Sequence, residues 1–318
     1  MSNTPFIEFR KVRDFGDVLN VTFAYLRQNI KLLGKSLLFI AGPVALAGGL
    51  SGLGFVEQMA ESPPSDEPDF SIFGWSYFML LGLSLFASVL GVTVVNSHMM
   101  LYAERGGPDG FDFNDIWAKV KEYVGSMFIA AMFSIMLYFA SAFIFVIPLA
   151  LTLGIGTSTG SMIVIAAFLF IGTVLWILGF FYFIVIIALI FPVKMHESLG
   201  IFEAFSRCRY LMKNNYMSSF AVLIVSAILM TILGLLFNAP GYALSFMGGF
   251  HALSQEDTAW IRYPLTVASV IGSLASSVLY SVPFSAMAMQ YFALVEKKDK
   301  TGLINRIDDL SEEIDGLS

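Results

Sequence analysis

The chain alternates between long apolar stretches and short segments that mix charged, polar and aromatic residues. A helix needs roughly 20 apolar residues to cross the hydrocarbon core of a bilayer. Six stretches reach that length, at about 33–56, 71–103, 123–153, 160–193, 215–240 and 263–295. We therefore predict an all-α polytopic membrane protein with six transmembrane helices. Pro43, Pro148 and Pro283 fall inside or near the ends of these stretches and are expected to bend them.

The mixed segments recur at a regular spacing. Tyr25, Trp117 and Tyr210, which are 92 and 93 residues apart, each lie in a segment that leads into an apolar stretch. Glu104 and Glu197 follow the second and fourth stretches, also 93 residues apart. This spacing predicts three repeats of an interfacial helix and a two-span hairpin within one membrane domain, 1–318. The repeats cover 6–104, 105–197 and 198–296, and a cytoplasmic amphipathic tail, 297–318, follows.

Composition and charge agree with a membrane protein. The chain is 57% hydrophobic and 13% charged, whereas soluble domains carry about 25% charged residues. Lys and Arg gather on the cytoplasmic side of membranes. If the N-terminus is cytoplasmic, only Arg262 of the 18 Lys and Arg residues falls in an outer loop, and the outer segment 57–69 is acidic. Both termini are therefore expected inside, and the net charge of −6 gives no reason to expect nucleic acid.

Residues 201–216 form a candidate contact surface for lipid or protein. Their aromatic and apolar side chains share one helical face, opposite several charged residues. Such a segment is typical of a helix at the membrane interface. In one interpretation it only anchors the bundle. In the other, Arg207, Arg209 and Lys213 bind anionic lipid headgroups or a protein partner.

Serine recurs at every fourth position of the last apolar stretch, at Ser269, Ser273, Ser277, Ser281 and Ser285. A step of four keeps these hydroxyls along one side of a helix. Small residues in such a stripe allow neighbouring helices to pack closely. The functional alternative is a polar-lined cavity or lipid groove formed with Thr93 or Asn96 of the second stretch.

The tail has apolar residues at alternating steps of four and three, at Leu303, Ile307, Leu310 and Ile314. This is the pattern of a coiled-coil seam, but about two heptads are too short to stand alone in water. The tail therefore needs a partner surface, either the basic helices of the same chain or another protein.

Catalytic or metal chemistry is not indicated. No predicted span has Asp, Glu, Lys or Arg in its central part, which argues against a proton- or sodium-coupled carrier. Three histidines are too few for a clustered metal site, and a single cysteine, Cys208, excludes an internal disulfide. Ser51 lies in a GLSG motif, but the only histidine expected on its side of the membrane, His251, is in a loop. We expect no catalytic residue, metal or cofactor.

One run carries a family resemblance. In residues 190–220 a span ends in proline and an acidic residue, and then come glycine, Glu-Ala, Ser-Arg and a basic helix. The matching residues are Pro192, Glu197, Gly200, Glu203, Ala204, Ser206 and Arg207. The run resembles the glycerophosphodiester phosphodiesterase membrane-domain-like group, and residues 13–43 resemble uncharacterised membrane proteins of Bacteroidetes-type bacteria. The resemblance implies a module of the bacterial cytoplasmic (inner) membrane, without the catalytic domain of those enzymes.

Two functions remain open. The leading hypothesis is a non-enzymatic membrane scaffold or accessory subunit, whose cytoplasmic amphipathic helices contact anionic lipid and whose tail contacts a protein partner. The alternative is a transport or lipid-handling protein with a polar groove along the last span.

Overall fold

The computed structural model describes residues 6–61, 74–108, 110–154, 159–253 and 259–300, and over these ranges the protein consists of α-helices joined by short turns. The helices are α1 (Phe15–Ile40), α2 (Gly42–Glu61), α3 (Trp75–Arg105), α4 (Phe113–Gly154), α5 (Thr159–His196), α6 (Ile201–Met212), α7 (Tyr216–Leu253), α8 (Ala259–Leu279) and α9 (Ser281–Asp299). The predicted all-helical class is confirmed.

The helices have the length and composition of membrane spans. Five segments of the described chain are long and apolar enough to cross a membrane. A sixth is reached if α1 and α2, which bend by 53° at their junction, count as one span. The number of spans thus agrees with the six apolar stretches of the sequence.

Two helix breaks lie close to prolines. Ala41 separates α1 from α2 and precedes Pro43 by two residues, and Tyr280 separates α8 from α9 and precedes Pro283 by three. Proline has no amide hydrogen to donate to the carbonyl four residues before it, so a helix readily bends there. The bend expected near Pro43 is therefore present, at 53°. Near Pro283 the helix is interrupted at Tyr280, but α8 and α9 together still form one long apolar segment, Trp260–Asp299, and α4 continues through Pro148 without a break.

Helix boundaries differ from the predicted division into interfacial and spanning parts. α4 runs for 42 residues without interruption, about 63 Å at 1.5 Å per residue. It contains most of the polar segment 111–127 and continues into the apolar stretch that follows. In the same way, α1 contains polar residues from Phe15 onward and continues into the start of the first apolar stretch. Only α6 is a separate short helix, which a turn at Asn214, with φ of 67°, divides from α7.

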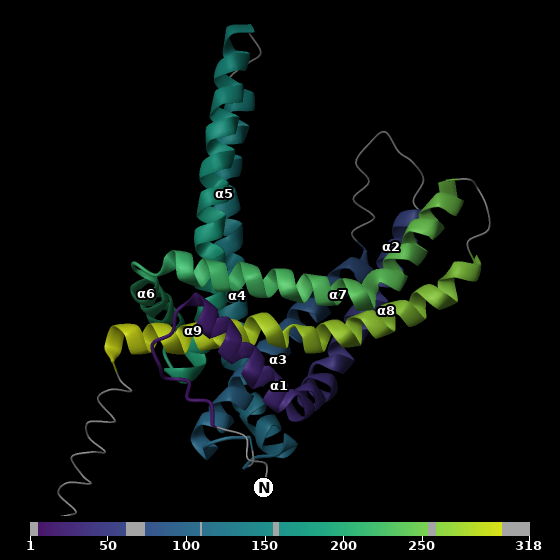
Figure 1. The fold of residues 1–318 in the computed structure, drawn as a ribbon. Helices are drawn as coiled ribbons and strands as arrows, with labels where there is room; N and C mark the ends of the chain where they lie inside the picture. Colours follow the sequence, from purple (N-terminus) through teal and green to yellow (C-terminus); the bar gives the residue numbers. More distant parts are fainter. Residues whose placement is uncertain (1–5, 62–73, 109, 155–158, 254–258, 301–318) are drawn as a thin grey trace, which may run out of the picture.

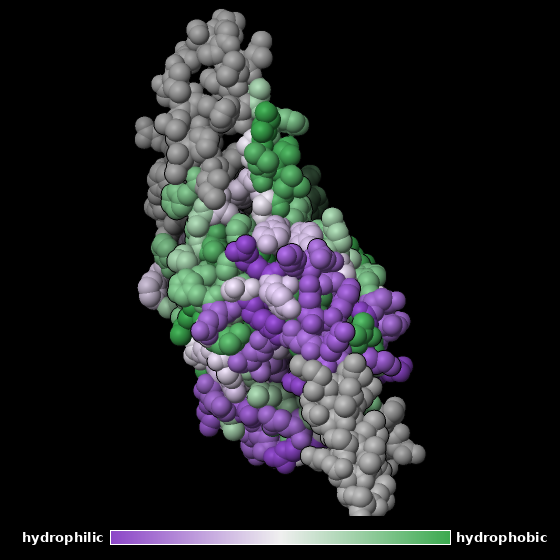
Figure 2. All heavy atoms as spheres, turned by 90° about the vertical axis from the view of Figure 1, so that its left-hand side faces the viewer, coloured by the Kyte–Doolittle hydropathy of each residue, from purple (hydrophilic) through white to green (hydrophobic). Residues whose placement is uncertain are grey.

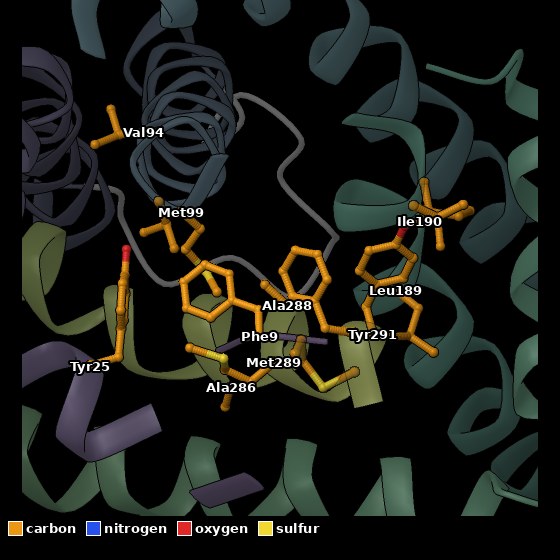
Figure 3. Close-up of a cluster of buried hydrophobic side chains, with 14 of the residues drawn as sticks. Phe9, Tyr25, Val94, Met99, Leu189, Ile190, Ala286, Ala288, Met289 and Tyr291 are labelled. Atoms are coloured by element: carbon orange, nitrogen blue, oxygen red, sulfur yellow. The ribbon is translucent and has the colours of Figure 1, made fainter. Parts of the chain in front are cut away.

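The helices diverge from a common base. The α4–α5 hairpin projects away from the rest of the bundle, while α7 and α8 extend in another direction beside α2 (Figure 1). The main hydrophobic core lies where α1, α3, α5 and α9 meet, and side chains such as Met99, Ile190 and Met289 fill it (Figure 3). This base holds the ends of both hairpins.

A carboxylate closes the first turn of three helices. In α1 and α4 the residue just before the helix accepts a hydrogen bond from a backbone amide three positions later. In α6 the side chain at the third helical position accepts from the backbone amide of the residue just before the helix. The bonds run from the Asp17 amide to Asp14 Oδ1 (2.9 Å), from the Asp115 amide to Asp112 Oδ1 (3.1 Å) and from the Gly200 amide to Glu203 Oε2 (3.1 Å). Such caps satisfy amides that have no partner within the helix.

Candidate functional site

A cavity of about 220 Å³ lies between α2, α3, α7 and α8. Both helix breaks border it, since Ala41 and Tyr280 are among its lining residues. The others are Ala45, Gly49, Leu80, Ser84, Ala87, Ser88, Gly91, Asn238, Gly272, Ser273, Ser276, Ser277 and Phe284. The breaks and the small residues together leave this space unfilled between the helices.

The cavity is neutral and opens at one side. Its lining carries hydroxyl and amide groups among apolar atoms, and no acidic or basic side chain. Ala41, Gly91 and Ser277 are buried and form its floor, whereas Ser88 and Tyr280 are exposed and form its rim. The lining residues of α3 lie within Trp75–Arg105, one of the segments that are long and apolar enough to cross a membrane.

Three polar groups of the lining donate to the backbone of their own helix. Ser273 Oγ donates to the Ser269 carbonyl at 2.7 Å, and Ser277 Oγ donates to the Leu274 carbonyl at 2.7 Å. Asn238 Nδ2 donates to the Gly234 carbonyl at 2.9 Å. The hydroxyl hydrogens of Ser273 and Ser277 are engaged with the backbone, so their oxygens keep lone pairs for a ligand that brings its own donor, while the Asn238 amide keeps an acceptor oxygen and a second N–H.

Glycines bring the helices around the cavity into close contact. A Cβ atom at Gly49 would lie 2.1 Å from Ser273 Oγ, and one at Gly272 would lie 2.3 Å from Asn238 Oδ1. At Gly48 the nearest such contact is Ser84 Oγ, at 3.4 Å. Ser273 therefore packs against α2, and it also lines the cavity together with Ser277.

The break at Tyr280 divides the serine stripe. Ser273 and Ser277 line the cavity, whereas Ser269 contributes its carbonyl to a bond along α8. Ser281 and Ser285 lie beyond the break and are buried in α9. The α3 side of the cavity is formed by residues between Leu80 and Gly91 rather than by Thr93 or Asn96, whose side chains donate to the carbonyls of Val89 and Val92.

Arg207 differs from the other two basic residues of α6. Its Nε donates to Glu197 Oε2 at 2.9 Å, and its Nη2 pairs with Asp299 Oδ2. Burial acts to lower its pKa, but the bonds to Asp299 and Glu197 outweigh burial and raise the pKa above its usual range. Arg209 and Lys213 are exposed. Figure 2, which views the molecule from the side where α6 lies in Figure 1, shows a hydrophilic band beneath apolar side chains.

Neighbouring positions of α6 have different roles. Cys208 is fully buried against the core, and burial raises the pKa of its thiol. Phe202, which belongs to the aromatic face of the helix, is 73% exposed, and its ring centroid lies 5.7 Å from that of Phe133. The predicted tail contacts at Leu303, Ile307, Leu310 and Ile314 lie outside the described residues.

Sequence reasoning missed a strap formed by residues 6–14. Phe9 inserts between the rings of Tyr102 and Phe292, with ring centroids at 5.2 and 5.3 Å, and contacts Tyr25 edge-on. The Ile7 amide donates to the Tyr102 hydroxyl at 3.0 Å. Arg13 donates to the carbonyl of Phe9 at 2.7 Å, and burial lowers the pKa of this guanidinium. The strap thus closes the end of the bundle where α1, α3 and α9 meet.

A buried polar pair lies beside the strap. The Tyr25 hydroxyl is 2.6 Å from His98 Nδ1, and both residues are fully buried. A lone histidine in an apolar run gives no sign of this partner, 73 positions away in the chain.

The described residues contain no group of three or more His, Cys, Asp or Glu side chains that could hold a metal ion. Comparison of the chain with protein-family models, with curated protein sequences and with solved structures gives no match. The likeness of residues 190–220 to the glycerophosphodiester phosphodiesterase membrane-domain-like group therefore stays an expectation that rests on those residues.

Proposed function

We propose that this protein holds a small neutral lipid, or a lipid-like molecule, in the cavity between α2, α3, α7 and α8. The observation that carries the proposal is the uncharged cavity, which is lined by hydroxyl and amide groups among apolar atoms and is bordered by a helix apolar enough to span a membrane. Ligand sites in proteins are concave and mostly apolar, with a few well-placed polar groups. The proposed role is non-enzymatic and is a lipid-handling one.

The chemistry of the lining selects the ligand. An anionic headgroup would need a basic side chain inside the cavity, because burying an unpaired charge is costly. The lining has no basic side chain and offers neutral hydroxyl and amide groups instead, among them the acceptor oxygens of Ser273, Ser277 and Asn238. A hydroxyl or amide donor on an apolar chain fits this arrangement, as in a monoacylglycerol or a long-chain alcohol.

Extraction of the protein from its native membrane in mild detergent tests the proposal. Mass spectrometry of the purified protein identifies the lipids that remain bound. The expected result is one enriched neutral lipid, which is lost when Ser277→Leu fills the floor of the cavity. Bound lipid of the same composition as the whole membrane, in both proteins, would contradict the proposal.

A scaffold role is the second candidate, and exposed cations support it. Arg209 and Lys213 lie on the surface together with the exposed rings of Phe202 and Tyr210. Basic and aromatic side chains at one surface suit contact with anionic lipid. Deletion of 301–318 tests whether the tail recruits a protein partner, since an unchanged set of co-purified proteins would count against that role.

The threefold repeat and the orientation are also proposals. The similar caps of α1, α4 and α6 support the repeat, as does the pairing of each acidic span end with the following helix. Glu104 pairs with Lys119 of α4 at 3.5 Å, and Glu197 pairs with Arg207 of α6 at 2.9 Å. We place both termini in the bacterial cytoplasm, on the charge distribution of the loops. Reporter fusions at each terminus test this orientation.

A further inference from the structure

The outward side of α6 carries a stripe of exposed residues. Ala204, Cys208 and Leu211 face the core and are fully buried. Positions on the opposite side recur at steps of four, three and four and so share one side of the helix. We call these residues, all of which are exposed, the α6 stripe: Phe202, Ser206, Arg209 and Lys213. The helix thus presents one aromatic ring and two cations to its surroundings.

The end of α9 lies beside this part of α6. The Tyr210 ring has Lys298 Nζ at 5.4 Å and Arg207 Cζ at 5.5 Å from its centroid. Lys297 Nζ donates to Asn215 Oδ1, in the turn that follows α6, at 2.7 Å. Figure 1 shows α6 and this end of α9 on the same side of the molecule, and Figure 2, which views that side, shows hydrophilic side chains gathered there. We call the α6 stripe together with the last turn of α9 the basic surface.

The acidic side chains of this region are already engaged or buried. Arg207 pairs with Glu197 and Asp299, Glu203 caps its own helix, and Glu296 is buried in α9. Within the part of the chain that the structure describes, five cations of the basic surface make no ion pair: Arg209, Lys213, Lys297, Lys298 and Lys300. The surface therefore carries an excess of positive charge.

The next 18 residues of the chain, 301–318, have the complementary composition. They contain one basic residue, Arg306, and five acidic ones: Asp308, Asp309, Glu312, Glu313 and Asp315. Their apolar residues, at alternating steps of four and three, need an apolar partner, and the exposed rings of Phe202 and Tyr210 offer one. A helix of 18 residues is about 27 Å long, and α6, with 12 residues, is about 18 Å long. The tail starts directly after Lys300 and is long enough to cover the basic surface.

Tethering favours this surface over a separate protein as the tail's partner. Exposed ion pairs are individually weak. A segment joined to its site by a few residues is present there at an effective concentration on the order of millimolar, so weak contacts hold it in place.

We propose that the acidic tail, 301–318, folds back on the basic surface of its own chain. Its carboxylates pair with the cations of α6 and α9, and its apolar side chains cover the exposed rings. The proposal does not depend on the ligand of the lipid cavity. In the scaffold candidate, the docked tail has to leave before the basic surface contacts anionic lipid.

The distance between two spin labels in the full-length protein, in a neutral detergent, tests the docking. In a Cys208→Ala chain, one label is attached at Met217→Cys, which is 75% exposed just after α6, and the other at Ser311→Cys in the tail. The proposal predicts one narrow distance distribution. Arg209→Glu with Lys213→Glu should abolish the narrow peak and leave the broad distribution of a flexible segment.

A matched pair of cations and a charge exchange serve as controls. Arg27→Glu with Lys31→Glu reverses two exposed cations, also four positions apart, on α1 and should keep the narrow peak. In the chain with both α6 cations reversed, Asp308→Lys with Glu312→Lys should restore it.

Three results would overturn the proposal. The first is a broad distribution in the chain that keeps all its native charges. The second is a narrow peak that survives reversal of the α6 cations, or one that the charge exchange fails to restore. The third is loss of the narrow peak when labelled protein is diluted with an excess of unlabelled protein, because the tail would then bind a second copy of the chain.

Discussion

Arg207 of α6 holds Glu197, just after α5, through its Nε at 2.9 Å, and holds Asp299, the last residue of α9, through its Nη2. The Tyr291 hydroxyl donates to Glu197 Oε1 at 3.0 Å and extends the same network. One guanidinium thus joins α6 to the ends of two other helices, α5 and α9. Arg209 and Lys213, which are exposed, lie outside this network.

Replacement of Arg207 should destabilise the protein. Its side chain is 23% exposed, and hydrogen bonds to charged groups contribute roughly 1.5–3 kcal/mol each. Arg207→Gln is expected to lower the free energy of unfolding by about 2 kcal/mol, as measured by denaturation in detergent. Arg209→Gln, two positions along and exposed, should change it by less than about 0.5 kcal/mol. Equal losses in the two variants would contradict the network's structural role.

Close contacts around the cavity predict the effect of added methyl groups. Gly49→Ala and Gly272→Ala place a Cβ within 2.1 and 2.3 Å of Ser273 Oγ and Asn238 Oδ1, so these side chains must move or the helices must separate. Overpacking of this kind costs about 1–3 kcal/mol. Gly82→Ala and Gly234→Ala meet nothing within 4 Å. They should be neutral or slightly stabilising, since alanine favours helices. Thermal unfolding of the four variants in one detergent distinguishes these outcomes.

Loss of the Tyr25 hydroxyl should be costly. Tyr25→Phe leaves His98 Nδ1 buried without its partner at 2.6 Å, and an unpaired buried group costs about 1–3 kcal/mol. Tyr263→Phe, at a side chain that is 79% exposed, is the matched control and should have little effect. A stability loss confined to the Tyr25 variant is the expected result of chemical denaturation. Unchanged stability of that variant would show that His98 obtains another partner.

The single cysteine should resist modification. Burial raises the pKa of the Cys208 thiol, so the thiolate, which is the reactive form, appears at higher pH than in a free cysteine. A free thiol reacts about tenfold faster as the pH rises from about 7 to 8.5, because its pKa is about 8.5. Native Cys208 should react far more slowly than a free thiol at each pH in this range, and its rate should still be climbing at the upper end, where that of a free thiol begins to level off. Unfolding should restore the rate of a free thiol. Maleimide labelling at several pH values measures this, and a free-thiol profile in the native state would contradict it.

The sequence predicts the helices better than their boundaries. Length and apolarity alone identify the stretches that become spans, and Pro43 and Pro283 mark both helix breaks. The ends of the polar segments are less predictable, because polar residues continue a helix as readily as apolar ones. For this reason α4 is one helix where the pattern suggested an interfacial part and a span.

The candidate site shows where sequence reasoning ends. Serines at every fourth position indicate a polar face of α8, and this face does border the cavity. The partners across it, Ser84, Ser88 and Asn238, come from helices whose relative rotation no local pattern sets. Phe9 lies in the polar segment before α1, which shows no hydrophobic periodicity. Its position among three rings therefore depends on the tertiary structure alone.

Native mass spectrometry with two lipids of equal chain length tests the central claim most directly. The detergent-solubilised protein is offered monooleoylglycerol or oleate, which share a chain and differ in charge. Ser276→Phe fills the cavity, while Ile271→Phe adds the same ring on the lipid-exposed side of α8. The account predicts that the wild-type protein and Ile271→Phe retain one monooleoylglycerol, that Ser276→Phe retains none, and that oleate is not retained. Equal retention by all three proteins, or a preference for oleate, would contradict a neutral ligand in this cavity.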